Sequence, residues 1–194
     1  MRRNVLMAAL LLLSAAAMRA QVAAVYVTSS SGRFSNVATG TILTTSGFQE
    51  QYTNFWTSGI GGGVTLNFLP VGPLKLGFDL RGSTHPGTVG ADTAMGGVKA
   101  AFNPPLIHIK PYIQASGGYV ATRTVNVTSG TNGATFNNKY AAWEILGGVD
   151  VPLAPFFDLR VIELGGGTGV SVPGSSNTPN ISLFTINSGL VVHF

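Results

Sequence analysis

The sequence predicts an all-β fold, an eight-stranded antiparallel up-and-down transmembrane β-barrel. Three observations predict it. Only 9% of the 194 residues are charged and 26 are glycine, whereas about a quarter of the residues in an ordinary soluble domain are charged. Segments of about ten residues alternate apolar and polar side chains, which is the pattern of a strand. Short connections alternate with long ones, as they do in membrane barrels.

The first twenty residues have the features of a secretory signal peptide, so the barrel domain is expected over 21–194. An arginine pair forms a charged start, and Val5 to Ala17 form an apolar stretch too short to cross a bilayer as a helix. Cleavage after Ala20 or after Ala17 fits these residues. Loss of the three arginines of this segment leaves 8 of the 11 Lys+Arg residues against 7 Asp+Glu, so no basic surface for nucleic acid is expected.

Connections of two kinds alternate along the rest of the chain. Short turns containing proline are expected at Leu69–Pro73, Asn103–Pro105 and Val151–Pro155. Stretches rich in Gly, Ser, Thr and Asn are expected as longer loops, over about 30–53, 84–91, 123–138 and 166–179. This alternation predicts hairpins whose short turns, together with both chain ends, lie on the periplasmic side.

Eight strands fit between these connections. The first lies near 22–29 and is too apolar on both faces to be oriented. The others are expected over about 55–68, 74–83, 92–103, 107–122, 139–151, 156–164 and 182–194. In these seven strands one face is apolar and the other carries small and polar side chains. The apolar face is therefore expected to contact lipid and the polar face to line the lumen.

The ionisable residues of the strands fall on the polar face and predict a charge network in the lumen. The network comprises Lys75, Asp79, Arg81, Lys99, Lys110, Glu144, Asp150, Asp158 and Arg160. Glu163 shares the face of Leu159 and Val161, so either a bulge follows Arg160 or Glu163 lies close to the membrane interface. Salt bridges that fill the barrel are the main interpretation of this network, and a narrow gated ion pore is the alternative.

Aromatic residues on the apolar face are expected at the two membrane boundaries. Phe68, Phe102, Phe157 and Phe194 lie at short-turn ends, whereas Trp56, Tyr119 and Trp143 lie toward the long-loop ends. Such girdles are typical of membrane barrels. A soluble lipocalin-like barrel in the periplasm is the competing fold. It would carry many more charges on its exterior than this chain can supply.

Four stretches carry a family resemblance: Pro111–Tyr119, Leu146–Asp150, Phe157–Arg160 and Ser188–Phe194. Their order along the chain resembles the small eight-stranded outer-membrane barrels typified by the OmpA transmembrane domain and OmpX. The resemblance implies a monomer in the bacterial outer membrane, surrounded by outer-membrane lipid. It also implies a partner in the barrel assembly machinery, which in that family recognises the final strand. Leu190, Val192 and Phe194 match that apolar, aromatic-terminated pattern.

The resemblance implies a structural or surface-interaction role, exerted through extracellular loops that bind an external ligand. The longest predicted loop, 30–53, carries Phe34, Phe48 and Tyr52 and is the first candidate for such contact. A less favoured alternative is a lipid A-modifying enzyme. Its Ser–His–acid set would consist of Ser83, His85 and Glu163.

Other chemistry finds no support in the residues. The glycine runs at 59–63 and 165–169 are followed by no helix pattern, so they do not predict a phosphate-binding loop. The chain has no cysteine, and its 3 histidines lack metal-ligand spacing. We therefore expect no cofactor, no metal site and no enzymatic activity.

Overall fold

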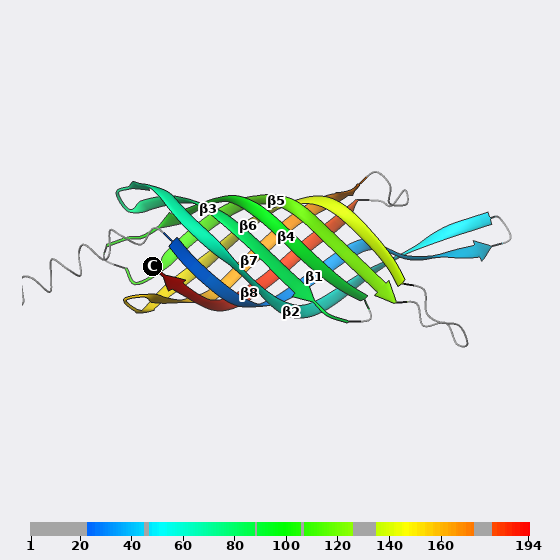
Figure 1. The fold of residues 1–194 in the computed structure, drawn as a ribbon, viewed down its shortest axis with the longest axis horizontal. Coiled ribbons are helices and arrows are strands. Elements are labelled where there is room, and N and C mark those ends of the chain that lie inside the picture. The colour runs from blue at the N-terminus through cyan, green and yellow to red at the C-terminus, as the bar shows by residue number, and fades with distance from the viewer. Residues whose placement is uncertain (1–22, 45–46, 88, 106, 126–134, 173–179) are drawn as a thin grey trace, which may run out of the picture.

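Eight strands close into a single antiparallel barrel in which β1 also pairs with β8 (Figure 1). The computed structural model describes residues 23–44, 47–87, 89–105, 107–125, 135–172 and 180–194. The predicted fold class is confirmed. The expected signal peptide lies outside the described residues. Within them, no helix has the length and apolarity needed to cross a bilayer.

The strands follow each other around the barrel in chain order. They are β1 (Ala23–Thr44), β2 (Gly47–Val71), β3 (Leu74–His85), β4 (Val89–Phe102), β5 (Lys110–Val125), β6 (Thr135–Ala154), β7 (Phe157–Ser171) and β8 (Ile181–His193). The connections after β2, β4 and β6 lie at the same end of the barrel as the carboxy terminus, as the turn pattern predicts (Figure 1). The strands also run at a pronounced tilt to the barrel axis, as closure requires.

Side chains alternate between the lumen and the exterior along each strand. In β8, buried residues at every second position from Ile181 to Asn187 alternate with exposed ones. The outside is apolar, with Val27, Ile60 and Leu80 at 64%, 66% and 66% exposure. This arrangement differs from that of a lipocalin-like barrel, which would bury the apolar face.

Pairing with both neighbours settles the orientation of β1, which the sequence leaves open. Tyr26 and Thr28 are buried in the lumen, whereas Val25 and Val27 face outward. Tyr26 lies between Gly63 of β2 and Val191 of β8. Small polar and aromatic side chains of β1 therefore point inward. The sequence leaves this orientation open because neighbouring residues near the start of the strand, such as Ala24 and Val25, are both apolar.

The predicted loop over 30–53 is wrong. β1 continues to Thr44 and β2 begins at Gly47, and the two strands pair along this length with bulges near Phe34 and Ala38. Serine, threonine and glycine suggest a loop here, but a small residue such as Ser30 also suits a lumen-facing strand position, where it is buried. β-branched residues such as Val37 and Ile42 favour strand structure at the remaining positions.

Other boundaries differ from the prediction for a similar reason. The loops expected over 84–91, 123–138 and 166–179 are shorter than expected. The first is shortened because β3 ends at His85 and β4 begins at Val89. The second is shortened because β5 ends at Val125 and β6 begins at Thr135, and the third because β7 ends at Ser171. Residues 126–134 and 173–179 lie outside the described part. β5 begins at Lys110 rather than near 107.

A closed barrel of this kind is expected to resist SDS until it is heated. The unboiled chain should migrate differently from the boiled chain on an SDS gel, because the closed hydrogen-bonded ring has no free edge at which unfolding can begin. The measurement uses chain isolated with the membrane fraction. A chain recovered in the soluble fraction, with the same migration before and after boiling, would contradict the membrane barrel.

Candidate functional site: the filled lumen

The inside of the barrel is divided into an apolar part and a charged part. The apolar part, which we name the apolar cluster, lies toward the far end from the carboxy terminus. It consists of Phe34, Val37, Ala91, Met95, Val120, Tyr140, Ala142, Ile181 and Leu183. Phe34, expected in an external loop, is instead fully buried and stacks on Phe55 at 5.5 Å. The bulge that follows Phe34 ends the regular pairing at this level, and β1 and β2 then continue as a ribbon.

The charged part, which we name the central network, is built around two arginines. Arg81 Nε lies 3.0 Å from Asp79 Oδ1, and its Nη1 lies 2.9 Å from Glu163 Oε1. Arg160 Nε lies 3.0 Å from Asp150 Oδ1, and its Nη1 lies 3.3 Å from Glu163 Oε2. Glu163 therefore joins both arginines. Ion pairs of this kind hold strands β3, β6 and β7 together across the lumen.

Glu163 points inward because β7 contains a bulge. The register of β7 against β8 shifts between Arg160 and Glu163, and both Val161 and Ile162 face outward. Because the bulge adds one extra residue on the outside, the residues that follow it exchange faces, and Glu163 points into the lumen. Of the two alternatives that the sequence leaves open for Glu163, the structure shows the bulge.

The Glu163 carboxylate accepts hydrogen bonds from four side chains. Besides the two arginines, Tyr112 Oη donates to Oε2 at 2.6 Å and Asn187 Nδ2 donates to Oε1 at 2.8 Å. A buried carboxylate is stable in this position because all its acceptor sites are used. Sequence reasoning did not place Glu163, Tyr112 or Asn187 in the network. The alternation of side chains along the strands could have placed two of them, since Tyr112 shares the polar face of Lys110 and Asn187 lies on the polar face of the last strand.

Two tyrosines stack against the buried cations. The Arg160 guanidinium lies 4.4 Å from the ring centre of Tyr26 and 4.9 Å from that of Tyr112, and Lys99 Nζ lies 3.7 Å from Tyr112. Cation–π attraction adds to the ion pairs in this desolvated interior. Gly63 and Gly148 make room for the rings, since a Cβ at either position would collide with the neighbouring tyrosine.

A second group of charges lies at the short-turn mouth of the barrel. Lys110 Nζ donates to Asp158 Oδ2 at 2.7 Å, and His193 Nε2 lies 2.7 Å from the same oxygen. Lys75 and Lys99 line a cavity of about 40 Å³ together with these residues. The mouth is therefore positively charged on balance.

The structure places all the residues of the predicted charge network inside the barrel, but it does not pair all of them. Lys99 reaches Asp150 at 3.6 Å. Lys75 forms no ion pair with any described residue. Glu144 is 6% exposed and forms neither an ion pair nor a hydrogen bond within the described part of the chain. These two unpaired charges are at different levels of the lumen, because Lys75 lies at the mouth and Glu144 lies deeper, on β6.

The Ser–His–acid set considered from the sequence does not form. His85 Nε2 lies 3.0 Å from Ser30 Oγ, and its Nδ1 lies 3.2 Å from the Ala91 carbonyl oxygen. Ser83 instead shares a hydrogen bond of 2.7 Å with Thr93. Glu163 belongs to the central network. His85 is fully buried beside Phe34.

The predicted aromatic girdle lies on the outside of the barrel. Its members, Trp56, Phe68, Phe102, Tyr119, Trp143, Phe157 and Phe194, are each between 44% and 66% exposed. Trp143 pairs with Thr168 of β7, and Phe157 begins the same strand. At about 3.3 Å per residue and a tilt of about 40°, the two levels are roughly 27 Å apart, close to the apolar band of a membrane barrel.

Comparisons with known proteins give similarity at the level of overall shape. No family model and no curated protein matches the chain. Neisserial surface protein A is 13% identical, with a TM-score of 0.49 over 88% of this chain and 99% of that chain. Ail of Yersinia pestis, solved with the heparin analogue sucrose octasulfate, is 10% identical, with a TM-score of 0.46 over 89% and 99%. The amino-terminal β-barrel domain of Pseudomonas aeruginosa OprF is 12% identical, with a TM-score of 0.42 over 88% and 97%. These values are too low to carry a statement about function.

Replacing Arg160 should destabilise the barrel far more than replacing an exposed arginine. The variant Arg160→Met leaves Asp150 and Glu163 with a missing partner in a dry interior, and we expect a loss of about 3–5 kcal/mol in the free energy of unfolding. The measurement is urea unfolding of the barrel in detergent or lipid.

The matched control is Arg123→Met. Arg123 pairs with Asp92 at 3.0 Å, but the two side chains are 50% and 42% exposed. A pair of this kind contributes about 0–1 kcal/mol. Equal losses in the two variants would show that the central network does not stabilise the fold.

Proposed function

We propose that this chain is an integral barrel of the bacterial outer membrane that acts at the cell surface through the projecting end of its first hairpin. The observation that carries the proposal is the unequal length of the strands. β1 pairs with β8 only as far as Ser35, and β2 pairs with β3 only from Ile60 onward, while β1 and β2 pair with each other up to Thr44 and Gly47.

The membrane part of the proposal rests on the apolar exterior. Large apolar side chains cover the outside of the described strands, among them Val27, Ile60, Leu80, Ile113 and Ile145, each more than half exposed. A soluble monomer rarely exposes a continuous apolar patch larger than a few hundred Å². A closed ring of strands is also one of the two structures that can span a bilayer with all backbone groups paired.

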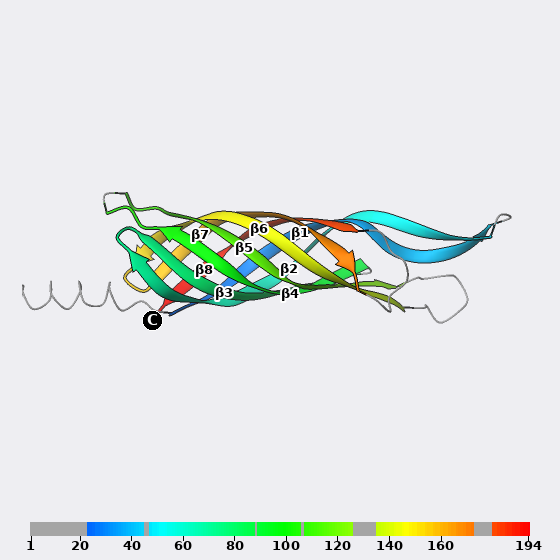
Figure 2. The ribbon, with the colours of Figure 1, turned by 90° about the horizontal axis from the view of Figure 1, so that it is seen from above.

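The surface part of the proposal rests on the ribbon formed by 36–44 and 47–54. It extends past the other strands at the end opposite the carboxy terminus (Figures 1 and 2). At about 3.3 Å per residue, its β1 strand reaches roughly 30 Å beyond the last β8 pairing. Among the described strands, these residues pair only with each other, so the outer edges of the ribbon are open to a partner. Unpaired strand edges are a common route of protein recognition.

Glu50 is the only charged residue of this ribbon. Its other residues are mostly Thr, Gly and β-branched or aromatic residues, which favour extended structure and contact through the backbone. A ligand recognised through strong charge, such as a polyanion, does not fit this composition. An external protein or a largely uncharged surface fits it better.

Delivery to the membrane is proposed to depend on the outer face of β8. Leu190 and Phe194 are 51% and 66% exposed on the barrel exterior, and Val192 lies between them on the same strand. This face fits recognition by the barrel assembly machinery before the strand closes against β1. Two cavities lie in the lumen, of about 30 and 40 Å³, each with room for about one or two water molecules, and this tight filling favours a structural role for the barrel interior.

Removing the projecting ribbon should abolish surface contact without unfolding the barrel. The variant joins Val37 to Thr53, which are already paired, through a two-residue Asn-Gly turn. Cells that carry the variant should lose adhesion to host cells or coated surfaces, measured by counting attached bacteria. The change in gel migration on boiling should persist, which serves as the control for folding. Unchanged adhesion by a correctly folded variant would exclude the ribbon as the contact site.

A further inference from the structure

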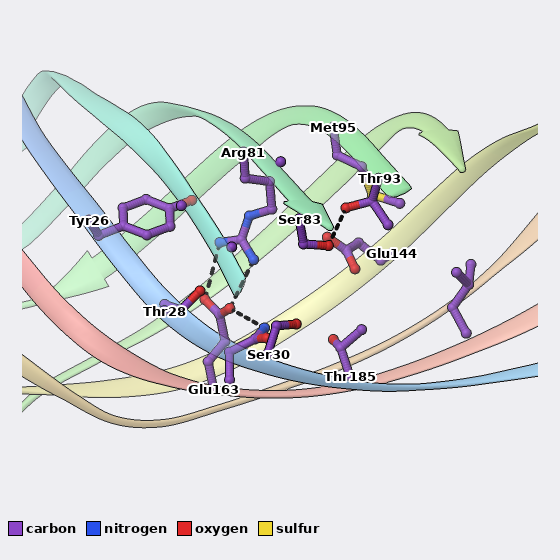
Figure 3. Close-up of a pocket in the computed structure, with 15 residues that line it drawn as sticks. Tyr26, Thr28, Ser30, Arg81, Ser83, Thr93, Met95, Glu144, Glu163 and Thr185 are labelled. Carbon is purple, nitrogen blue, oxygen red and sulfur yellow. Dashed lines mark hydrogen bonds and ion pairs between the residues drawn. The ribbon is translucent and has the colours of Figure 1, made fainter. Parts of the chain in front are cut away.

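A small cavity lies inside the barrel where the central network meets the apolar cluster (Figure 3). Its volume is about 30 Å³, and its lining includes Glu144, Thr185 and Thr28. We propose that it is a binding site for one monovalent alkali cation, Na⁺ or K⁺, with Glu144 as the charged ligand. The site is separate from the surface contact proposed above.

The ion pairs at this level of the interior leave one acid without a directly paired cation. The three cations Arg81, Lys99 and Arg160 are matched by Asp79, Asp150 and Glu163 through the ion pairs described above. Glu144 is an additional acid without a partner among the described residues. An ionised carboxylate that is removed from water and left unpaired is strongly unfavourable. A bound cation would remove this cost.

A second unpartnered group lines the same cavity. The Oγ1 atom of Thr185 is fully buried and has no hydrogen-bond partner, and the residue is only 9% exposed. Glu144 and Thr185 come from β6 and β8, which lie on either side of β7. Buried polar atoms without a partner are rare in folded proteins, so each needs a physical explanation. One ion with oxygen ligands would account for both.

The remaining ligands are hydroxyl groups. Ser30 bonds to His85, and Ser83 bonds to Thr93, but a hydroxyl oxygen has two lone pairs and can also contact an ion. Carboxylate and hydroxyl oxygens are the ligands that hard cations prefer. Figure 3 shows these side chains lining one space, with Arg81 already bound to Glu163.

Two glycines lie beside proposed ligands of the site. A Cβ at Gly165 would collide with Thr185 Oγ1, and a Cβ at Gly61 would lie 3.0 Å from Thr28 Oγ1 and 3.3 Å from the Cβ of Ser83. Both glycines lie on strands that separate the proposed ligands, Gly61 on β2 and Gly165 on β7. Any larger residue would fill part of the cavity or displace an oxygen.

The size and charge of the site favour a monovalent ion. A cavity of about 30 Å³ holds one ion with about one water molecule. The described residues contain no group of three or more His, Asp, Glu or Cys side chains able to hold a metal ion, so the strong multi-carboxylate cage of a divalent ion is missing. A divalent ion would also overcompensate the single unmatched charge.

Thermal unfolding in matched salts tests the site. The barrel, purified from membranes in detergent with urea added to bring unfolding into range, is heated in NaCl, KCl or choline chloride at equal concentration. Choline is too large for the cavity. We expect Tm to be about 5 °C higher in at least one alkali salt, at about 100 times the Kd of the ion. The Glu144→Gln variant should show no difference among the salts.

The two buried threonines provide a matched pair of further variants. Thr185→Val should reduce the salt-specific shift, since it removes a ligand. Thr122→Val should keep the shift, since Thr122 Oγ1 is also buried and unpartnered but does not line the cavity. If Glu144→Gln fails to fold, this pair decides the question, and equal shifts in both variants would overturn the proposal.

Two other outcomes would also overturn it. One is an identical Tm for the unaltered barrel in all three salts. The other is an infrared band of a neutral carboxylic acid that persists in saturating Na⁺ and K⁺ and disappears in Glu144→Gln. That band would show that a proton, rather than an alkali ion, compensates the charge of Glu144.

Discussion

Closure of the sheet between β1 and β8 is the constraint on which the rest of the structure depends. Backbone N–H and C=O groups in hydrocarbon have no water to bond, so a spanning sheet must pair its last strand with its first. Ala24 pairs with His193 and Ser35 with Ser182, so the ring is closed along most of its height. Closure creates a narrow interior that must be filled by side chains of every strand.

Filling that interior explains both the charges and the glycines. Long arginines reach across the lumen, and each one needs carboxylates within hydrogen-bonding distance, because an unpaired charge in this dry space is very unfavourable. Glu163 satisfies this need for Arg81 and Arg160 together. Glycines such as Gly63 and Gly148 allow the tyrosine rings to pack against the cations.

The projecting ribbon and the filled lumen suggest a division of labour within one short chain. In the proposed function, the barrel supplies a rigid support held by buried ion pairs, and the ribbon supplies the strands that contact a partner beyond the membrane. The cavity beside Glu144 adds a third element. A bound cation there would complete the charge balance at the level where the interior changes from charged to apolar.

Local patterns in the sequence were enough to determine the number of strands, their antiparallel order and the faces of most of them, because the period of two is set by the backbone itself. They also predicted the inward direction of Asp79, Arg81 and Glu144. Tertiary structure decided what depends on neighbouring strands. The bulge in β7 turned Glu163 into the lumen, and pairing with β2 converted the loop expected at 30–53 into strand. Packing across the barrel buried Phe34 and left Glu144 without a partner. None of these is encoded in one segment, since each depends on contacts between residues far apart in the chain.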